Sequence, residues 1–528
     1  MLVLGLRAFL RAPLNVDEEL TLRIAGESLG SIFHIVSSER GGGPVHFWLE
    51  HATRSWPGGL AGLRLPSLLA LLAALPAAAL VAAELAGRAA AAAAVLLLGA
   101  APLAVSYSTF GRPHALLLAW TQWGTALGLL AARRGGARLW VAAGAVLGSS
   151  VFAHPTAPLY ALVAFAGAVL YARRPLRAWP GAVALAVTLV PYEAATLHVL
   201  RDRYGVGGGE SGRTFSGNPV WHDALHVVAP GRHDLNWLSA AAAAGLAALL
   251  ARRRGRAAAV LVLTVVAPVV FFSAVPTSGT SGLFFDRYML PALPAFLTLA
   301  AAGCVAGAQL AWRLRVPALV LLVAGLLTVE LRPVLTRQSH LARLGLGTLT
   351  AAVRDESDGA VLFGSAGSTR RGGFLGAFTF GRPAALADRY LSLRLPGLPV
   401  VNDDTCVPVV AFLRDGGPPR RGVWVFYAAY ADQLAAAERA LAGVPGVGVR
   451  TVAGHFLLAA SATPASPRAL VGRGLALRRA WLRAVPSNRR AALLVAADRT
   501  ALDAPSRCRP VGILGDPDLD PHYPLRAP

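Results

Sequence analysis

Long apolar runs separated by short polar turns fill the first two thirds of the 528-residue chain. As helices, runs of this kind approach the ~30 Å thickness of the hydrocarbon core of a bilayer. They lie at about 63–84, 89–106, 113–132, 138–153, 155–172, 178–199, 237–251, 257–275, 288–311 and 316–332. Residues 1–14 are also apolar, but they carry Arg7 and Arg11 and are too few to cross alone. The pattern predicts a polytopic α-helical membrane protein with about 10–11 spans.

The apolar runs shorten to strand length after about residue 340. Short runs that predict β-strands lie at 359–363, 398–401, 423–426 and 455–458, and a helical pattern at 429–443 lies among them. We therefore expect a transmembrane domain at 1–335, whose outer loop at 11–62 holds amphipathic helices. An α/β domain at 336–465 and an Arg- and Pro-rich extension at 466–528 follow.

Arginine clusters set the predicted sidedness of the spans. They occupy alternate connections, at 133–138, 173–177, 252–256 and 313–315, which the positive-inside rule places in the cytoplasm. The other connections then face outward: 11–62, 107–112, around 154, 200–236, 276–287 and everything after about 333. We expect a multi-pass protein of the cell (plasma) membrane whose C-terminal domain is extracytoplasmic.

Composition narrows the class further. The chain is 55% hydrophobic and its mean hydropathy is +0.53, which excludes an ordinary soluble globular protein. Its formal net charge of +22 comes from arginine alone. Two causes account for this charge better than nucleic-acid binding does. Arginines set the topology of the spans, and the composition is typical of a GC-rich genome such as that of an actinobacterium. No nucleic-acid partner is predicted.

Polar residues whose side chains are suited to catalysis or binding gather on the predicted outer side. Three consecutive carboxylates, Asp17, Glu18 and Glu19, begin the first outer loop, where acid so close to a bilayer is costly unless it is used or solvated. The other outer positions are Arg64, Tyr107, Arg112, His114, His154, Arg287 and Tyr288. Arginines hold phosphate through charge-assisted, often bidentate hydrogen bonds, and a carboxylate can take a proton from an attacking hydroxyl. A lipid-phosphate-linked sugar needs both.

In order and sidedness, six short motifs resemble the GT-C glycosyltransferases of the protein O-mannosyltransferase and aminoarabinose transferase type. The motifs are Asp17-Glu18, Gly43-Pro44-Val45-His46-Phe47-Trp48, Arg64-Leu65-Pro66-Ser67, the segment 107–116, His154-Pro155 and Arg287-Tyr288-Met289-Leu290-Pro291. The resemblance covers about residues 15–300. It departs from the family pattern at Phe110, where relatives often carry glutamate, and at His114, where they usually carry another aromatic residue.

The resemblance implies an inverting transfer of a hexose or pentose from a polyprenyl-phosphate sugar donor. The acceptor would be an extracytoplasmic lipid, cell-wall glycan or protein, and mannose is one donor sugar consistent with a mannosyltransferase-like enzyme. Asp17 would be the general base and Glu18 its support. Arg112, Arg287 and Arg64 would hold the donor phosphate. The implied substrate-binding residues are His46, Tyr107, His114, His154 and Tyr288.

Several features leave alternatives open. His46 and Glu50 share a helix face at i, i+4, but amphipathic packing of the loop helix, with Phe47 and Trp48 at the membrane interface, is favoured over a metal site. No metal or other cofactor is predicted, and a divalent metal requirement stays open.

Two functions of other classes remain. A lipid-linked sugar flippase would show ionisable residues at mid-membrane or broken helices, whereas the span centres here are apolar. A catalytically inactive GT-C-like scaffold is suggested by Phe110. Cys406 and Cys508 both fall in the predicted outer domain, where an oxidising environment would let them form a disulfide.

Overall fold

The structure is a computed structural model of the whole chain. It describes residues 18, 21, 24–40, 43–54, 56, 60–204, 219–229, 236–275, 286–343, 346–356, 358–363, 395, 400–401, 416–427, 431–454 and 456–484. The chain divides into two compact units, and the main boundary between them lies at Gln338 and Ser339.

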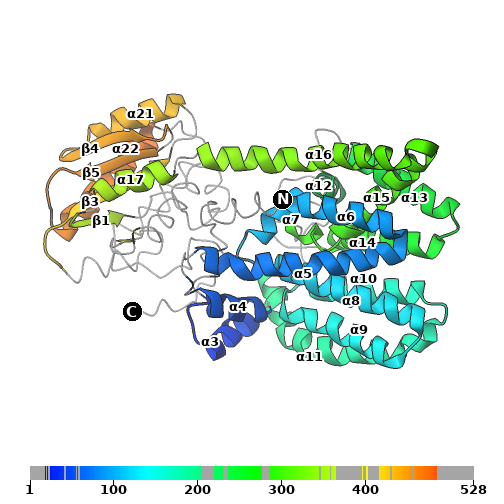
Figure 1. Cartoon of the computed structure of the whole chain (residues 1–528). Coiled ribbons are helices and arrows are strands. Elements are labelled where there is room, and N and C mark those ends of the chain that lie inside the picture. Colours follow the sequence, from blue (N-terminus) through cyan, green and yellow to red (C-terminus); the bar gives the residue numbers. More distant parts are fainter. Residues whose placement is uncertain are drawn as a thin grey trace. The chain divides into compact units, whose positions relative to one another are not determined.

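The first unit is entirely helical in its described part, as the apolar runs predict, and its long helices lie side by side (Figure 1). Its main helices are α3 (Leu29–His34), α4 (Val45–Thr53), α5 (Leu60–Ala86), α6 (Arg88–Ala100), α7 (Pro102–Ser108), α8 (His114–Arg134), α9 (Ala137–Ser149), α10 (Ala157–Tyr171), α11 (Trp179–Tyr204), α12 (Val220–Val228), α13 (Trp237–Ala251), α14 (Gly255–Ala274), α15 (Leu293–Leu310) and α16 (Arg315–Arg343). Short turns of other helix types are η1 (Ile35–Arg40), η2 (Ser150–Phe152), η3 (Pro175–Ala178), η4 (Asp286–Met289) and η5 (Trp312–Leu314).

Every predicted apolar run lies in one or two of these helices. The helices differ in length. Within the described ranges, five are long and apolar enough to cross a membrane: Ala61–Ala86, His114–Arg134, Pro175–Val199, Gly255–Ala274 and Leu293–Leu310. The pair α6 and α7 makes a sixth if it counts as one bent span. Shorter apolar helices lie at Ala137–Phe152, Ala157–Tyr171, Trp237–Ala251 and Arg315–Val329. The chain is a multi-pass helical membrane protein.

The run predicted as one span at 89–106 is bent by 59° between α6 and α7. Pro102 has no backbone N–H to continue the helix, and it disfavours helical geometry at the preceding residue. Ala101 accordingly has φ −60° and ψ 129°, and Pro102 begins the next helix. The bend leads α7 into the turn that carries Gly111 and Arg112, where it packs against α5 and α8.

Glycines let α13 and α15 approach closely. A Cβ on Gly245 would lie 1.9 Å from the carbonyl oxygen of Leu299, and one on Gly303 would lie 2.0 Å from that of Ala241. Helices in a membrane gain little from the hydrophobic effect, so close backbone packing at small residues stabilises their association. Helix α15 is consequently buried along most of its length.

The loop helix α4 packs inward more than its sequence predicts. Phe47 is buried at 6% exposure, so its side chain packs inside the protein. Trp48 stacks on Phe33 of α3 at 6.3 Å between ring centroids and donates from Nε1 to the carbonyl oxygen of Leu29. Gly43, just before α4, lies so close to Phe152 that a Cβ would meet its backbone at 2.2 Å. Helix α4 is therefore held tightly between α3, α5 and the end of η2.

The second unit is built on a five-stranded mixed sheet of order β2-β1-β3-β5-β4, in which β2, β1 and β3 are parallel and β3, β5 and β4 antiparallel. The strands are β1 (Ala360–Phe363), β2 (Val400–Val401), β3 (Arg421–Tyr427), β4 (Val447–Val452) and β5 (Phe456–Ser461). The helices are α17 (Leu346–Glu356), α21 (Ala431–Ala442) and α22 (Pro467–Ala484). The predicted mixture of strands and helices is confirmed.

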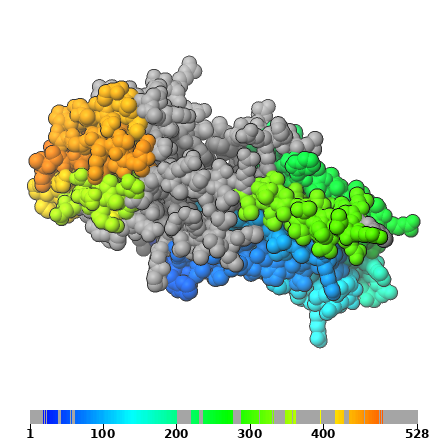
Figure 2. All heavy atoms as spheres, turned by 45° about the horizontal axis from the view of Figure 1, so that its top comes forward, coloured from blue at the N-terminus to red at the C-terminus, as the bar shows by residue number. Residues whose placement is uncertain are grey.

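Alternating side chains give this sheet two apolar faces. Trp424 and Phe426 of β3 pack with α21 and α22, which lie side by side at the surface of this unit (Figure 2). Val423 and Val425 face the opposite way and pack with Leu349 of α17. The sheet is therefore covered by helices on both faces.

Two elements of this unit lie outside the sequence-based expectations. Strand β4 was not predicted, because Gly448 and Arg450 dilute its apolar alternation. Helix α22 begins at Pro467, in the segment described from sequence only as an extension, and Leu470 and Leu477 of α22 belong to the core of this unit. The boundaries of the three predicted domains stay a prediction.

Candidate functional site

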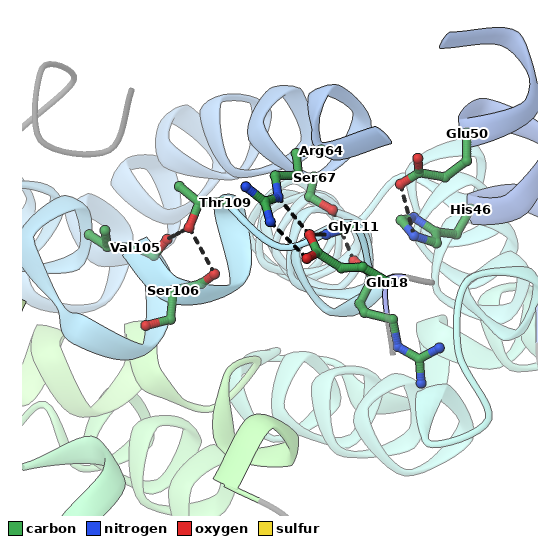
Figure 3. A network of polar contacts seen from close by, with 10 residues as sticks. Glu18, His46, Glu50, Arg64, Ser67, Val105, Ser106, Thr109 and Gly111 are labelled. Atoms are coloured by element: carbon green, nitrogen blue, oxygen red, sulfur yellow. Dashed lines mark hydrogen bonds and ion pairs between the residues drawn. The ribbon is translucent and has the colours of Figure 1, made fainter. Parts of the chain in front are cut away.

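A buried carboxylate–arginine pair lies at the centre of the site (Figure 3). Arg64, in the first turns of α5, donates from Nε to Oε1 of Glu18 at 2.6 Å and from Nη2 to Oε2 at 2.8 Å. The two side chains are 1% and 0% exposed. A bidentate pair of this kind is both strong and geometrically specific. Because Glu18 holds the guanidinium, Arg64 is committed to a carboxylate in this structure.

The turn between α7 and α8 joins the same cluster. The backbone N–H of Gly111 donates to Oε1 of Glu18 at 2.9 Å, and Ser67 Oγ donates to the carbonyl oxygen of Arg112 at 3.0 Å. A Cβ on Gly111 would lie 2.9 Å from Leu63 Cγ, so a larger residue would push the turn away from α5. The first acidic motif, the Arg64–Ser67 motif and the second outer turn thus form one hydrogen-bonded unit.

Helix α4 adds a second buried acid, Glu50, which was named in the sequence only as the helical partner of His46. His46 Nε2 lies 3.2 Å from Glu50 Oε1, and both side chains are 0% exposed. Burial lowers the pKa of His46 to about 3, although the nearby Gly111 backbone opposes this shift. Burial and the neighbouring Glu18 raise the pKa of Glu50 well above its ordinary value, while Arg64 lowers it. His46 is therefore neutral near pH 7, and burial favours the protonated form of Glu50.

An aromatic and imidazole cluster adjoins this unit. The ring of His114 lies 5.1 Å from that of Tyr107 and 4.8 Å from that of His154. Tyr288 lies 5.7 Å from His154, and its carbonyl oxygen accepts a hydrogen bond from Tyr160 Oη. Aromatic faces of this kind are suited to stack on the apolar faces of a ligand.

The protonation of His154 follows from its partners. The backbone N–H of Thr156 donates to Nδ1 of His154 at 3.1 Å, so Nδ1 accepts and the neutral ring carries its proton on Nε2. Burial first, and then Arg287, Arg112 and His46, hold the pKa of His154 well below its ordinary range. The ring is a neutral hydrogen-bonding group at pH 7.

Two of the three arginines expected to bind phosphate, Arg287 and Arg112, are close enough to His154 for each to lower its pKa. Arg287, in the turn η4, also lies over the ring of Tyr288 at 5.9 Å. Helix α15 begins at Leu293, so Tyr288, which the sequence placed in the span 288–311, belongs with Arg287 to the turn η4 before the helix. Cationic groups from two separate segments therefore act on the same histidine.

The structure brings together nearly all the residues that the sequence singled out. The described ones are Glu18, His46, Arg64, Tyr107, Arg112, His114, His154, Arg287 and Tyr288. Asp17, Cys406 and Cys508 lie outside the described residues, so their predicted roles stay predictions. The described part of the chain contains no group of three or more His, Cys, Asp or Glu side chains that could hold a metal ion. Glu50 is the residue that sequence reasoning left out of the site, and its i, i+4 spacing from His46 was the available signal.

Membrane-length helices with a buried polar cluster define the first unit as a multi-pass helical membrane unit, and the second unit is a helix-covered mixed sheet. No family model and no curated protein matches the chain by sequence. Solved structures do: ArnT from Cupriavidus metallidurans in the apo state superposes with a TM-score of 0.54 at 17% identity, covering 87% of this chain and 96% of that chain. The same protein bound to undecaprenyl phosphate gives 0.55 at 18% identity with the same coverage. The resemblance found in the sequence is thus confirmed at the level of the fold.

Proposed function

We propose that the chain is a membrane glycosyltransferase that moves a sugar from a polyprenyl-phosphate donor to an extracytoplasmic acceptor. The observation that carries this proposal is that groups from separate segments converge at one site. They are the Glu18–Arg64 pair, two further arginines (Arg112 and Arg287) and three histidines (His46, His114 and His154). A bound undecaprenyl phosphate in one ArnT structure supports a lipid phosphate as the ligand of this site. The alternation of arginine clusters supports an outward-facing site.

The reaction proposed is a single displacement at the anomeric carbon. Asp17 removes the proton from the acceptor hydroxyl as the new glycosidic bond forms and the bond to the phosphate breaks. Arg112 and Arg287 stabilise the phosphate as it leaves with the bonding electrons. Arg64 does not contact the phosphate in this proposal, although the sequence suggested that it would. It instead holds Glu18 and so positions the neighbouring residue, Asp17.

The neutral histidines fit the binding of a sugar. His154 offers Nε2–H as a donor, and His114 and Tyr107 lie next to it. Uncharged donors and aromatic faces recognise hydroxyls and C–H faces without competing for the phosphate charge. We assign these residues, with His46 and Tyr288, to the substrate.

One observation favours a second function. The break at Ala101 is the kind of interruption found in lipid-linked sugar flippases and other transporters. Helix α7, which follows this break, leads into the turn that carries Gly111. The break is therefore equally consistent with a role in positioning that turn for catalysis.

Proteoliposomes containing the purified protein and a polyprenyl-phosphate sugar labelled in the sugar separate these functions. A transferase moves the label into acceptor and releases polyprenyl phosphate. A flippase changes only the side of the membrane on which the intact donor is found, and that result would contradict the proposal.

A further inference from the structure

Three connections that carry clustered arginines meet at one end of the first unit. They are the turn between α8 and α9, the segment between α10 and α11 that holds η3, and the turn between α13 and α14. A Cβ on Gly135, in the first connection, would lie 3.3 Å from Nη1 of Arg177 in the second. Arg256, at the start of α14, donates from Nη1 to the carbonyl oxygen of Ala172 at 3.3 Å. Segments far apart in sequence therefore bring their arginines to one surface.

The charge of this surface is almost entirely positive. Its exposed arginines are Arg133, Arg134, Arg173, Arg174, Arg177, Arg252, Arg253, Arg254 and Arg256. The three connections, at 133–136, 172–178 and 252–256, contain no Asp or Glu. Within the described residues one ion pair reaches these arginines, from Arg133 to Glu84 at 3.3 Å. Like charges gathered in this way repel one another, so a further anion would stabilise the surface.

Exposed apolar side chains in the middle connection indicate what kind of anion this is. Leu176 of η3 is 88% exposed, and Trp179, the first residue of α11, is 68% exposed. Arg174 and Arg177 flank Leu176 in the sequence. Exposed tryptophan beside arginine is typical of the interface between the hydrocarbon core and water. A lipid headgroup is favoured over a soluble anion, because only a lipid also offers an apolar partner to Leu176 and Trp179.

We propose that this surface binds the headgroup of an anionic phospholipid. The phosphate lies among Arg174, Arg177 and Arg256, and the acyl chains pass Leu176 and Trp179. Guanidinium groups present planar pairs of N–H donors that match phosphate oxygens, and the negative charge of the lipid offsets the repulsion among the arginines. A lipid bound there bridges connections that belong to separate helix pairs. The binding is independent of the sugar transfer proposed above.

Quenching of Trp179 fluorescence by brominated lipid reports on this surface directly. The full-length protein in micelles of an uncharged detergent is titrated with phosphatidylglycerol or phosphatidylcholine, each brominated on its acyl chains. We expect stronger quenching by the anionic lipid at equal mole fraction, and the excess should be absent from Trp179→Phe. Inorganic phosphate should leave the excess unchanged. Equal quenching by the two lipids, or displacement by inorganic phosphate, would overturn the proposal.

Two double variants, matched in charge, separate a binding site from a general attraction. Arg174→Gln/Arg177→Gln should weaken the association of phosphatidylglycerol roughly 5- to 30-fold, because each arginine near a lipid surface contributes about 1 kcal/mol. Arg313→Gln/Arg315→Gln removes two exposed charges from η5 and the start of α16, which the sequence places on the same side of the membrane. This control should keep the wild-type affinity. Equal losses for the two variants would indicate only that basic loops attract anionic lipid, and the proposed site would be wrong.

Discussion

Removal of the Glu18 carboxylate is the most informative perturbation of the site. From described residues, Glu18 accepts hydrogen bonds from Arg64 at 2.6 and 2.8 Å and from the Gly111 backbone at 2.9 Å. The substitution Glu18→Ala leaves a guanidinium that is 1% exposed without this carboxylate, and it takes the acceptor away from a buried amide. Breaking a buried pair by deleting one partner typically costs about 3–5 kcal/mol.

A double-mutant cycle isolates the pair. Arg64→Ala alone should cost a similar amount, because it leaves the Glu18 carboxylate buried without its cation. The double variant Glu18→Ala/Arg64→Ala should cost less than the sum of the two by about 3 kcal/mol, since neither charge of the pair is left buried without the other. This coupling free energy is large because both groups are buried. An exposed pair would couple by only about 0.2–1 kcal/mol.

Equilibrium unfolding in mixed micelles, followed by tryptophan fluorescence, measures these differences. The exposed pair between Arg133 and Glu84, at 3.3 Å and with Arg133 56% exposed, is the matched control and should show little coupling. If the Glu18–Arg64 cycle gives no more coupling than the Arg133–Glu84 cycle, the reasoning that places a buried clamp at the centre of the site is wrong.

Two further predictions concern binding and packing. Arg112→Ala and Arg287→Ala should each weaken the binding of undecaprenyl phosphate by about 1.5–3 kcal/mol, or roughly 10- to 150-fold, as titration in detergent would show. Arg138→Ala, at the opposite, exposed end of the bundle, is the control, and equal affinities for all three would refute the assignment. Gly303→Ala should lower the thermal midpoint of the detergent-solubilised protein, because its Cβ would meet the Ala241 carbonyl oxygen at 2.0 Å. Gly325→Ala should leave the thermal midpoint unchanged, because Gly325 has open space around it. If both substitutions lower the midpoint equally, the close approach of α13 and α15 is contradicted.

The helices and the membership of the site could be predicted from sequence, for identifiable reasons. Apolar runs of span length have few alternatives to a helix, because every backbone polar group must be satisfied within the bilayer. Alternating arginine clusters then assign the remaining polar positions to one side. Residues as distant in sequence as His154 and Tyr288 were expected on one side on that ground, and their rings lie 5.7 Å apart.

The pairing inside the site could not be predicted. Hydropathy shows that Arg64 and Glu18 share a side, but not that the guanidinium lies in bidentate contact with the carboxylate. Glu50 was missed because an i, i+4 pair on a loop helix is as compatible with a solvated face as with a buried one. Strand β4 was missed because glycine and arginine interrupt its apolar positions, and pairing with β5 supplies the stabilisation that local sequence lacks.

The most direct test of the central claim is the rate of sugar transfer by wild-type protein and by Asp17→Asn in matched proteoliposomes. The proposed role of Asp17 as general base predicts that the wild type transfers the labelled sugar. It also predicts that Asp17→Asn inserts and binds undecaprenyl phosphate normally but transfers about 10²–10⁴-fold more slowly. Equal transfer rates for the two proteins would contradict the catalytic site described here.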